Sequence, residues 1–240
     1  AIEDPVTCFN FGEFTRRFGG LWTDSTVSYA VEDFFNNGGG QCVICRLFEP
    51  NNPADAGVAT ITHDALRLQA SSAGSWGDTL QITVTNPSTV DPEGTKAVAD
   101  RYGLDVTEIF DLLIEDTATK AREVFRTLSL KETAGQRRFD RVLEASNMVD
   151  FTPGADGAAQ FDDAVLAVTP NPVVAGGGND GAALSVGTYE GDIDKKTGIQ
   201  ALRKADIFNL LCIPPDTRGG TLPRPVREKA ALLCSQERAL

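Results

Sequence analysis

Residues 41–47 (QCVICRL) decide the fold of this chain. A nearly continuous apolar run of this length is typical of a strand that is buried on both faces, as in a sheet covered by helices. The preceding NNGGG at 36–40 ends a helix, because glycine tolerates a left-handed exit. A second apolar run at 207–213 stops at Pro214-Pro215 and predicts another buried strand, of the parallel type.

Helices flank both apolar runs. Asn10 and Glu13 have the spacing of a capping box, and the helix that follows ends at Gly19-Gly20. The next helix begins at Thr23 or Asp24. Further helices are expected at 134–146, where Thr133 and Gln136 resemble a capping box, at 199–204, and after Pro223 and Pro225. The two ends of the chain therefore alternate between helix and strand.

The middle of the chain has the period-two alternation of strands. It is clearest at 66–70 (LRLQA) and 80–85 (LQITVT), with SWGD at 75–78 as the turn between them. Strands are also expected at 109–114, 123–130 and 148–151. Residues 86–103 and 152–192, which are rich in turn-forming residues, predict surface loops.

These patterns predict an α/β (mixed α+β) fold in two domains. An α/β core domain would comprise residues 1–52 plus 153–240. A β-rich domain at 53–152 would be inserted into it, and EPNNPADAG at 49–57 marks the first boundary.

Composition narrows the function classes. The net charge of −12 over 240 residues disfavours nucleic acid as a partner. No stretch approaches the roughly 18 consecutive apolar residues that a membrane span needs. Five cysteines without a paired framework favour a reducing compartment. The chain starts at Ala1 rather than Met, so we expect the true start to lie upstream.

Two motifs resemble a metal or redox site and a nucleotide-binding loop, but their sequence context does not fit these sites. Cys42 and Cys45 form C-x-x-C, but positions three apart in a strand point to opposite faces and no second pair is present. Gly176, Gly178 and Gly181 match G-x-G-x-x-G, but no clear strand leads into them and the P-loop lysine is missing.

Two weaker candidates also fail. The acidic turn at Asp192 lacks calcium-loop spacing, because position twelve is Arg203 instead of glutamate. His63-Asp64 could belong to a catalytic triad, but the sequence contains no G-x-S-x-G motif that would provide the nucleophilic serine. We therefore expect no catalytic, cofactor-binding or metal-binding residue and no enzyme activity.

Several segments resemble the contractile phage tail sheath family. Each matches a family pattern, in the family's order: FNFGEFTRRFGG at 9–20, SYAV at 28–31, FFNNGG at 34–39, ASSAGSWGD at 70–78, the pair 123–129 and 139–146, GGNDG at 177–181, 198–202, and DIFNLLCIP at 206–214. Ala73 and Asp78 depart from the family's usual proline and asparagine.

The resemblance implies a structural subunit that polymerises around an inner tube and contracts to drive the tube through a target envelope. The implied partners are other sheath subunits, the tube protein and a baseplate, with no nucleic acid and no membrane insertion. The implied location is a virion tail, or the bacterial cytoplasm during assembly. Sheath subunits exchange strands through terminal arms. We expect these arms to be missing here, which would leave this piece a monomer.

Two other functions stay open. One is a generic oligomeric binding module. The other is a nucleotide-dependent α/β enzyme that uses residues 176–181. The resemblance alone does not distinguish a phage tail from a tailocin, a prophage remnant or a related contractile injection system.

Overall fold

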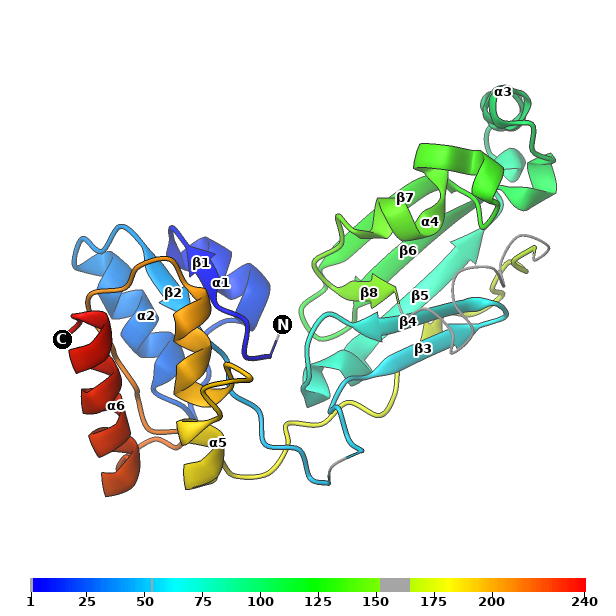
Figure 1. The fold of residues 1–240 in the computed structure, drawn as a ribbon. Helices are drawn as coiled ribbons and strands as arrows, with labels where there is room; N and C mark the ends of the chain where they lie inside the picture. Colours follow the sequence, from blue (N-terminus) through cyan, green and yellow to red (C-terminus); the bar gives the residue numbers. More distant parts are fainter. Residues whose placement is uncertain (1, 53, 152–164) are drawn as a thin grey trace. The chain divides into compact units, whose positions relative to one another are not determined.

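The computed structural model describes residues 2–52, 54–151 and 165–240, and it has a mixed α+β fold. The chain forms two compact units (Figure 1). Unit 1 comprises Ala1–Ala54 and Gly181–Leu240, and unit 2 comprises Asp55–Asp180. Residues 165–180, which sequence analysis assigned to the core domain, lie in unit 2 because strand β9 (Val173–Val174) pairs with β5 (Leu80–Thr85) there.

Unit 2 contains two antiparallel sheets. One has the order β3-β4-β8, formed by Thr60–His63, Leu66–Ala70 and Val149–Phe151. The other has the order β7-β6-β5-β9, in which β6 is Phe110–Asp116 and β7 is Arg122–Leu128. A bridge between Thr60 and Gly176 connects the two sheets. The strands expected at 66–70, 80–85, 109–114, 123–130 and 148–151 are confirmed, with small shifts of their ends.

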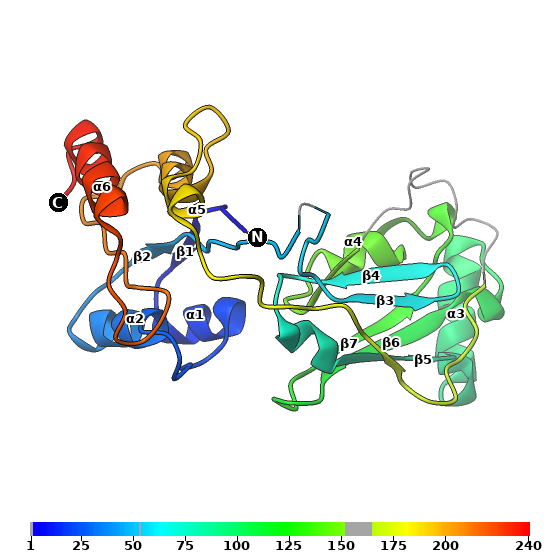
Figure 2. The same cartoon turned by 90° about the horizontal axis from the view of Figure 1, so that it is seen from below.

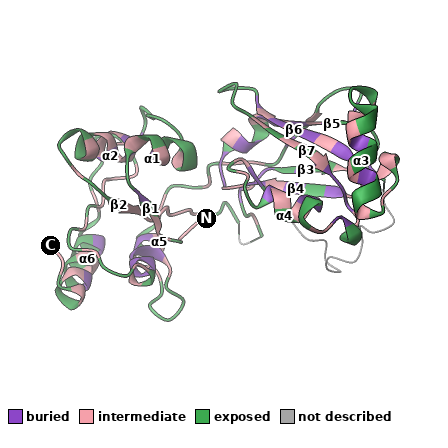
Figure 3. Cartoon of the chain, turned by 90° about the horizontal axis from the view of Figure 1, so that it is seen from above, coloured by how far each residue is buried: buried purple, intermediate pink, exposed green. Residues whose placement is uncertain are grey.

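Alternating side chains build the core of unit 2. Along β6, Phe110, Leu112 and Ile114 point inward and are at most 4% exposed. They join one large apolar cluster with residues of β3, β4, β5 and helix α4 (Phe139–Leu143). Figure 3 shows buried residues following β5 and β6, whereas unit 1 is mostly half-buried or exposed. Unit 2 therefore has a complete core of its own.

Two expectations for the helices of unit 2 were wrong. Residues 86–103 include helix α3 (Pro92–Tyr102), which Asp91 caps by accepting a hydrogen bond from the Gly94 N–H. The helix expected at 134–146 is only α4. A 3₁₀ helix (Glu132–Arg137) precedes it, and Gly135, with φ of 55°, interrupts the α-helical path.

Unit 1 places a two-stranded antiparallel sheet between helices. Strand β1 (Val6–Cys8) pairs with β2 (Cys42–Ile44). Figure 2 shows helices α1 (Phe11–Phe18) and α2 (Val27–Asn36) on one side of this sheet and α5 (Val186–Glu190) and α6 (Arg224–Glu237) on the other. The Asn10 side chain accepts a hydrogen bond from the Glu13 N–H and so caps α1, as expected. Helix α2 starts at Val27, later than expected.

The second apolar run does not form the predicted parallel strand. Residues 207–213 lie in no helix or strand, and their described backbone partner is Leu240, which accepts from the Leu211 N–H at 2.7 Å and donates to the Asn209 carbonyl at 3.0 Å. The strand β2 is antiparallel to β1, so the parallel sheet was also wrong. The helix expected at 199–204 is a 3₁₀ helix (Gly198–Lys204), and α6 confirms the last predicted helix.

The loop expected at 152–192 lies partly outside the described residues, at 152–164. Its remainder contains β9 and α5. Ser185 caps α5 by accepting a hydrogen bond from the Thr188 N–H. Both elements are too short to give a periodic hydrophobic pattern, so the sequence did not predict them.

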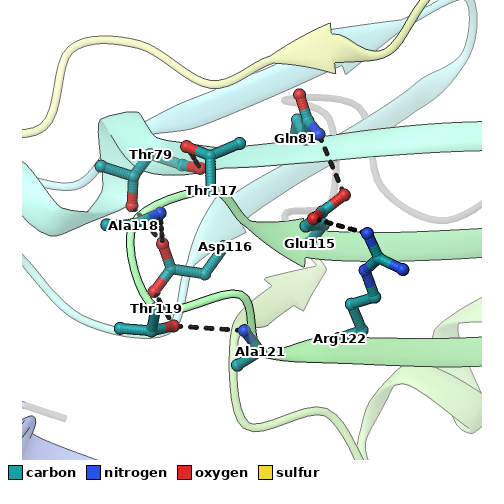
Figure 4. A network of polar contacts seen from close by, with 9 residues as sticks. All are labelled: Thr79, Gln81, Glu115, Asp116, Thr117, Ala118, Thr119, Ala121 and Arg122. Atoms are coloured by element: carbon teal, nitrogen blue, oxygen red, sulfur yellow. Dashed lines mark hydrogen bonds and ion pairs between the residues drawn. The ribbon is translucent and has the colours of Figure 1, made fainter.

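A polar network fixes the β6–β7 hairpin (Figure 4). The Asp116 carboxylate, 8% exposed, accepts hydrogen bonds from the hydroxyls of Thr79 and Thr119, each at 2.6 Å, and from the Ala118 N–H at 2.9 Å. Beside it, Gln81 and Arg122 donate to the Glu115 carboxylate at 3.1 and 2.9 Å. Burial raises the pKa of Asp116, but the hydrogen bonds outweigh this effect and leave the pKa below its ordinary value.

Replacing Asp116 tests how much this network stabilises unit 2. Asp116→Asn should lower the free energy of unfolding at neutral pH by about 1–3 kcal/mol, because an amide cannot accept all three hydrogen bonds. Since folding lowers the pKa of Asp116, its contribution is complete above about pH 4 and is lost as the pH falls through the folded-state pKa.

Urea unfolding at neutral pH and near pH 3 measures both effects. The difference between the wild type and Asp116→Asn should shrink at the lower pH. The matched control is Asp100→Asn on α3, where the carboxylate is 64% exposed, and it should change stability by less than about 0.5 kcal/mol. An Asp116→Asn protein as stable as the wild type at neutral pH would show that the network contributes nothing.

Candidate functional site

The cysteine pair that resembled a metal or redox motif is divided between two apolar clusters. Cys42 packs in the cluster with Cys8, Phe14 and Val31, whereas Cys45 packs in the cluster with Ile199 and Leu202 on the other face of β2. Burial raises the pKa of both thiols to about 11. Both thiols are mostly protonated at neutral pH, so neither is an activated nucleophile, and their separation into two clusters keeps them from acting as one metal-binding or redox pair.

The glycine-rich segment does not fit a phosphate. Its N–H groups are already used: Gly176 donates to the Thr60 carbonyl at 3.1 Å, and Gly178 donates to the Asp78 carboxylate at 2.7 Å. The Asp180 carboxylate accepts from the N–H and hydroxyl of Ser75. A phosphate group would displace these hydrogen bonds and meet like charges.

The other two candidates serve local structure. His63 Nε2 lies 2.7 Å from the Ala167 carbonyl, and Asp64 accepts from the Ala167 N–H, so the pair holds a neighbouring segment. Asp192 accepts from the N–H groups of Asp194 and Lys195, and the Lys195 hydrogen bond is the largest cause that lowers the pKa of Asp192. This is an Asx turn rather than a cation site.

Within residues 2–52, 54–151 and 165–240, no group of three or more His, Cys, Asp or Glu side chains could hold a metal ion. None of the helices in the same ranges is both long and apolar enough to cross a membrane.

Strand β2 has an unusual environment. Its side chains pack on both faces, with Cys42 and Ile44 in one cluster and Val43 and Cys45, just beyond its end, in the other. A strand covered in this way normally lies inside a sheet. Among the described residues, however, β2 pairs with β1 alone, so its second edge carries no strand. An open edge between two apolar layers has the backbone geometry to accept an added strand.

Exposed apolar side chains gather in unit 1. Of the fifteen large apolar side chains that are exposed in the described chain, ten belong to unit 1: Phe9, Leu21, Trp22, Phe34, Val186, Ile193, Ile207, Leu210, Leu232 and Leu240. The five in unit 2 are all valines. Ile207 and Leu210 are 79% and 67% exposed, and they flank Phe208, which packs in the same cluster as Val43 and Cys45. Unit 1 thus exposes more large apolar side chains than unit 2 does.

The two units also differ in charge. Unit 2 has 20 Asp and Glu residues against 10 Lys and Arg, a net charge of −10, whereas unit 1 has 14 against 12, a net charge of −2. Like charges repel when copies approach one another. Unit 1 is therefore the better suited of the two to close packing between copies.

Comparison with solved structures identifies proteins of the same fold. A sheath tail protein from Listeria innocua matches with a TM-score of 0.57 and 13% identity, over 99% of this chain and 42% of that protein. A sheath tail protein from Desulfitobacterium hafniense matches with a TM-score of 0.51 and 14% identity, over 99% and 43%. The chain shares its fold with these two proteins. It spans about two fifths of their length.

Sequence comparison adds nothing to this likeness. No protein-family model matches the chain, and no curated protein matches it. At identities of 13% and 14%, the structural match establishes the fold alone.

No site residue was predicted from the sequence. The open edge of β2 and the exposure of Ile207 and Leu210 are known only from the structure. The apolar composition of 207–213 was a sequence signal for such a surface, because solvent-exposed segments are usually more polar. An apolar run does not say whether its cover comes from the same chain or another.

We expect nucleotides not to bind the glycine-rich segment, because its N–H groups already have hydrogen-bond partners. ATP, GTP or NAD should not raise the thermal unfolding midpoint, because carboxylates already hold the N–H groups that a phosphate would need. A ligand at one hundred times its Kd would add about 2.7 kcal/mol, which a thermal shift assay detects easily. A nucleotide-dependent rise that Gly178→Val abolishes would contradict this interpretation of 176–181.

Proposed function

We propose that this chain is part of a structural subunit of a contractile tail sheath, in which subunits polymerise around an inner tube. The observation that supports this function most directly is β2, which is covered on both faces and unpaired on one edge in the described chain. A strand from a neighbouring subunit would satisfy its backbone groups and bury the apolar side chains around it. The shared fold with two sheath tail proteins supports the same proposal.

The two units would have different roles in the sheath. Unit 1 would be the core domain that contacts neighbouring subunits and lies near the tube, because it has most of the exposed apolar side chains and little net charge. Unit 2, with a complete core and a charge of −10, would face outward, where water and salt screen its charge.

Contraction would be mechanical. Subunits held in an extended array by exchanged strands would rearrange as nearly rigid bodies when a baseplate releases them, and the free energy difference between the two arrays would drive the tube through a target envelope. The tube protein and the baseplate are the further partners in this scheme. Assembly would take place in the bacterial cytoplasm, and the product would be a virion tail or a related injection system, including one encoded by a prophage.

Negative-stain electron microscopy of the full-length gene product that contains these residues tests the proposal. Long striated tubes are expected. Discrete particles, both alone and with the tube protein from the same gene cluster, would instead favour an oligomeric binding module.

Leu210 provides a sharper test of the surface beside β2. Leu210→Asp should weaken polymerisation at least about tenfold, because it would place a charge in an apolar interface. Its own unit should still fold, since the side chain is already 67% exposed. The matched control is Val90→Asp in unit 2, where the side chain is 88% exposed, and it should polymerise normally.

Critical concentration by sedimentation, with circular dichroism to check folding, measures both variants. Polymerisation of Leu210→Asp at the wild-type critical concentration would exclude this surface from the interface.

A further inference from the structure

Two of the five cysteines face each other across the β1–β2 ladder. The register places Cys8 directly opposite Cys42. Directly opposed residues of an antiparallel pair have Cα atoms about 4.5–5.5 Å apart. Disulfides span Cα separations of about 4.4–6.8 Å. The backbone therefore already holds these two residues at a distance that a disulfide can bridge.

The side chains share one environment. Both thiols belong to the apolar cluster of α1 and α2, with Phe14 and Val31, and both are free. Cys8 is fully buried, whereas Cys42 is partly exposed and can meet a small reagent. Burial and, to a smaller extent, the charge of a nearby Cys8 thiolate raise the pKa of Cys42 to about 11.

The other three cysteines lack such a partner in this sheet. Cys45 lies in the cluster on the opposite face of β2, together with Leu233. Cys212 is exposed in the segment 207–213, and Cys234 lies on α6. The pairing of Cys8 with Cys42 is therefore specific to the fold.

We propose that Cys8 and Cys42 are a latent cross-strand disulfide site, oxidised by a small disulfide such as oxidised glutathione. The Cys42 thiolate attacks one sulfur of glutathione disulfide, forms a mixed disulfide and releases one glutathione thiolate. The Cys8 thiolate then attacks the Cys42 sulfur, forms the protein disulfide and releases the second glutathione thiolate. Two protein thiols are oxidised and one glutathione disulfide is reduced to two glutathiones.

The high pKa of Cys42 makes the site slow at neutral pH. The thiolate is the reactive form, so the oxidation rate should rise about tenfold per pH unit while the pH stays below the pKa. The thiols would survive in a reducing compartment and oxidise slowly outside it. The disulfide would close the loop that carries α1 and α2 and tie β1 permanently to β2. This inference does not depend on the proposed sheath function.

The experiment uses the 240-residue chain with Cys212→Ser, which removes the exposed thiol. Folded protein is incubated with oxidised glutathione at alkaline pH, quenched with acid and alkylated in denaturant. Intact mass then distinguishes a protein disulfide, which loses two hydrogens, from a glutathione adduct. Trypsin leaves Cys42 and Cys45 in one peptide that ends at Arg46, so a parallel Cys45→Ser variant identifies the partner of Cys8.

The expected result is one intramolecular link that persists in Cys45→Ser and disappears in Cys8→Ser and Cys42→Ser. The oxidised protein should unfold about 10 °C above the reduced protein, because the closed loop has less entropy to gain on unfolding. In urea the same reagent should instead favour Cys42–Cys45, the shortest loop.

Three results would overturn the proposal. One is full retention of thiols in the folded protein while the urea-unfolded chain reacts. Another is a link to Cys8 that survives Cys42→Ser. The third is a link between two chains in place of one within a chain.

Discussion

The backbone of β2 constrains everything around it. Strand β2 is half-buried and packs side chains on both faces, so its amides and carbonyls find partners only along its two edges. The described chain provides β1 on one edge. The helices of unit 1 then form two apolar clusters, each with three buried residues, instead of one continuous core. Unit 1 therefore has two small clusters on either side of a two-stranded sheet, rather than one continuous core.

Unit 2 shows the opposite arrangement. Its strands bury their inward faces against one another, and 22 of the 31 buried apolar residues in the described chain belong to it, against nine in unit 1. Its polar side chains are used internally, as in the Asp116 network, and its surface is acidic. Such a unit gains little by packing against copies of itself. The two units thus differ in their apolar side chains, since unit 2 has most of the buried ones and unit 1 has most of the exposed ones.

Period-two alternation was sufficient to predict β4 to β7, because each strand has one face on the core. Helix α3 escaped prediction because only Thr95 and Ala99 are buried on it, which leaves no apolar stripe to recognise. Residues 207–213 were mispredicted for a different reason. Their hydrophobicity correctly indicated a need for burial, but a sequence does not state which chain supplies the cover. The unpaired edge of β2 required the structure, because no pattern in the sequence shows which strands pair.

The ends of unit 2 meet at one place. The Asn179 amide donates to both oxygens of the Asp55 carboxylate at 3.0 Å, and the Asn179 N–H donates to the Gly57 carbonyl. On the unit 1 side, the Ala182 N–H donates to the Glu49 carbonyl at 2.8 Å. The chain thus leaves and re-enters unit 1 through neighbouring points, so a short linker from Glu49 to Ala182 would close the gap if unit 2 were excised. Excision of unit 2 in this way would leave β2 and its pairing with β1 in unit 1 uncut.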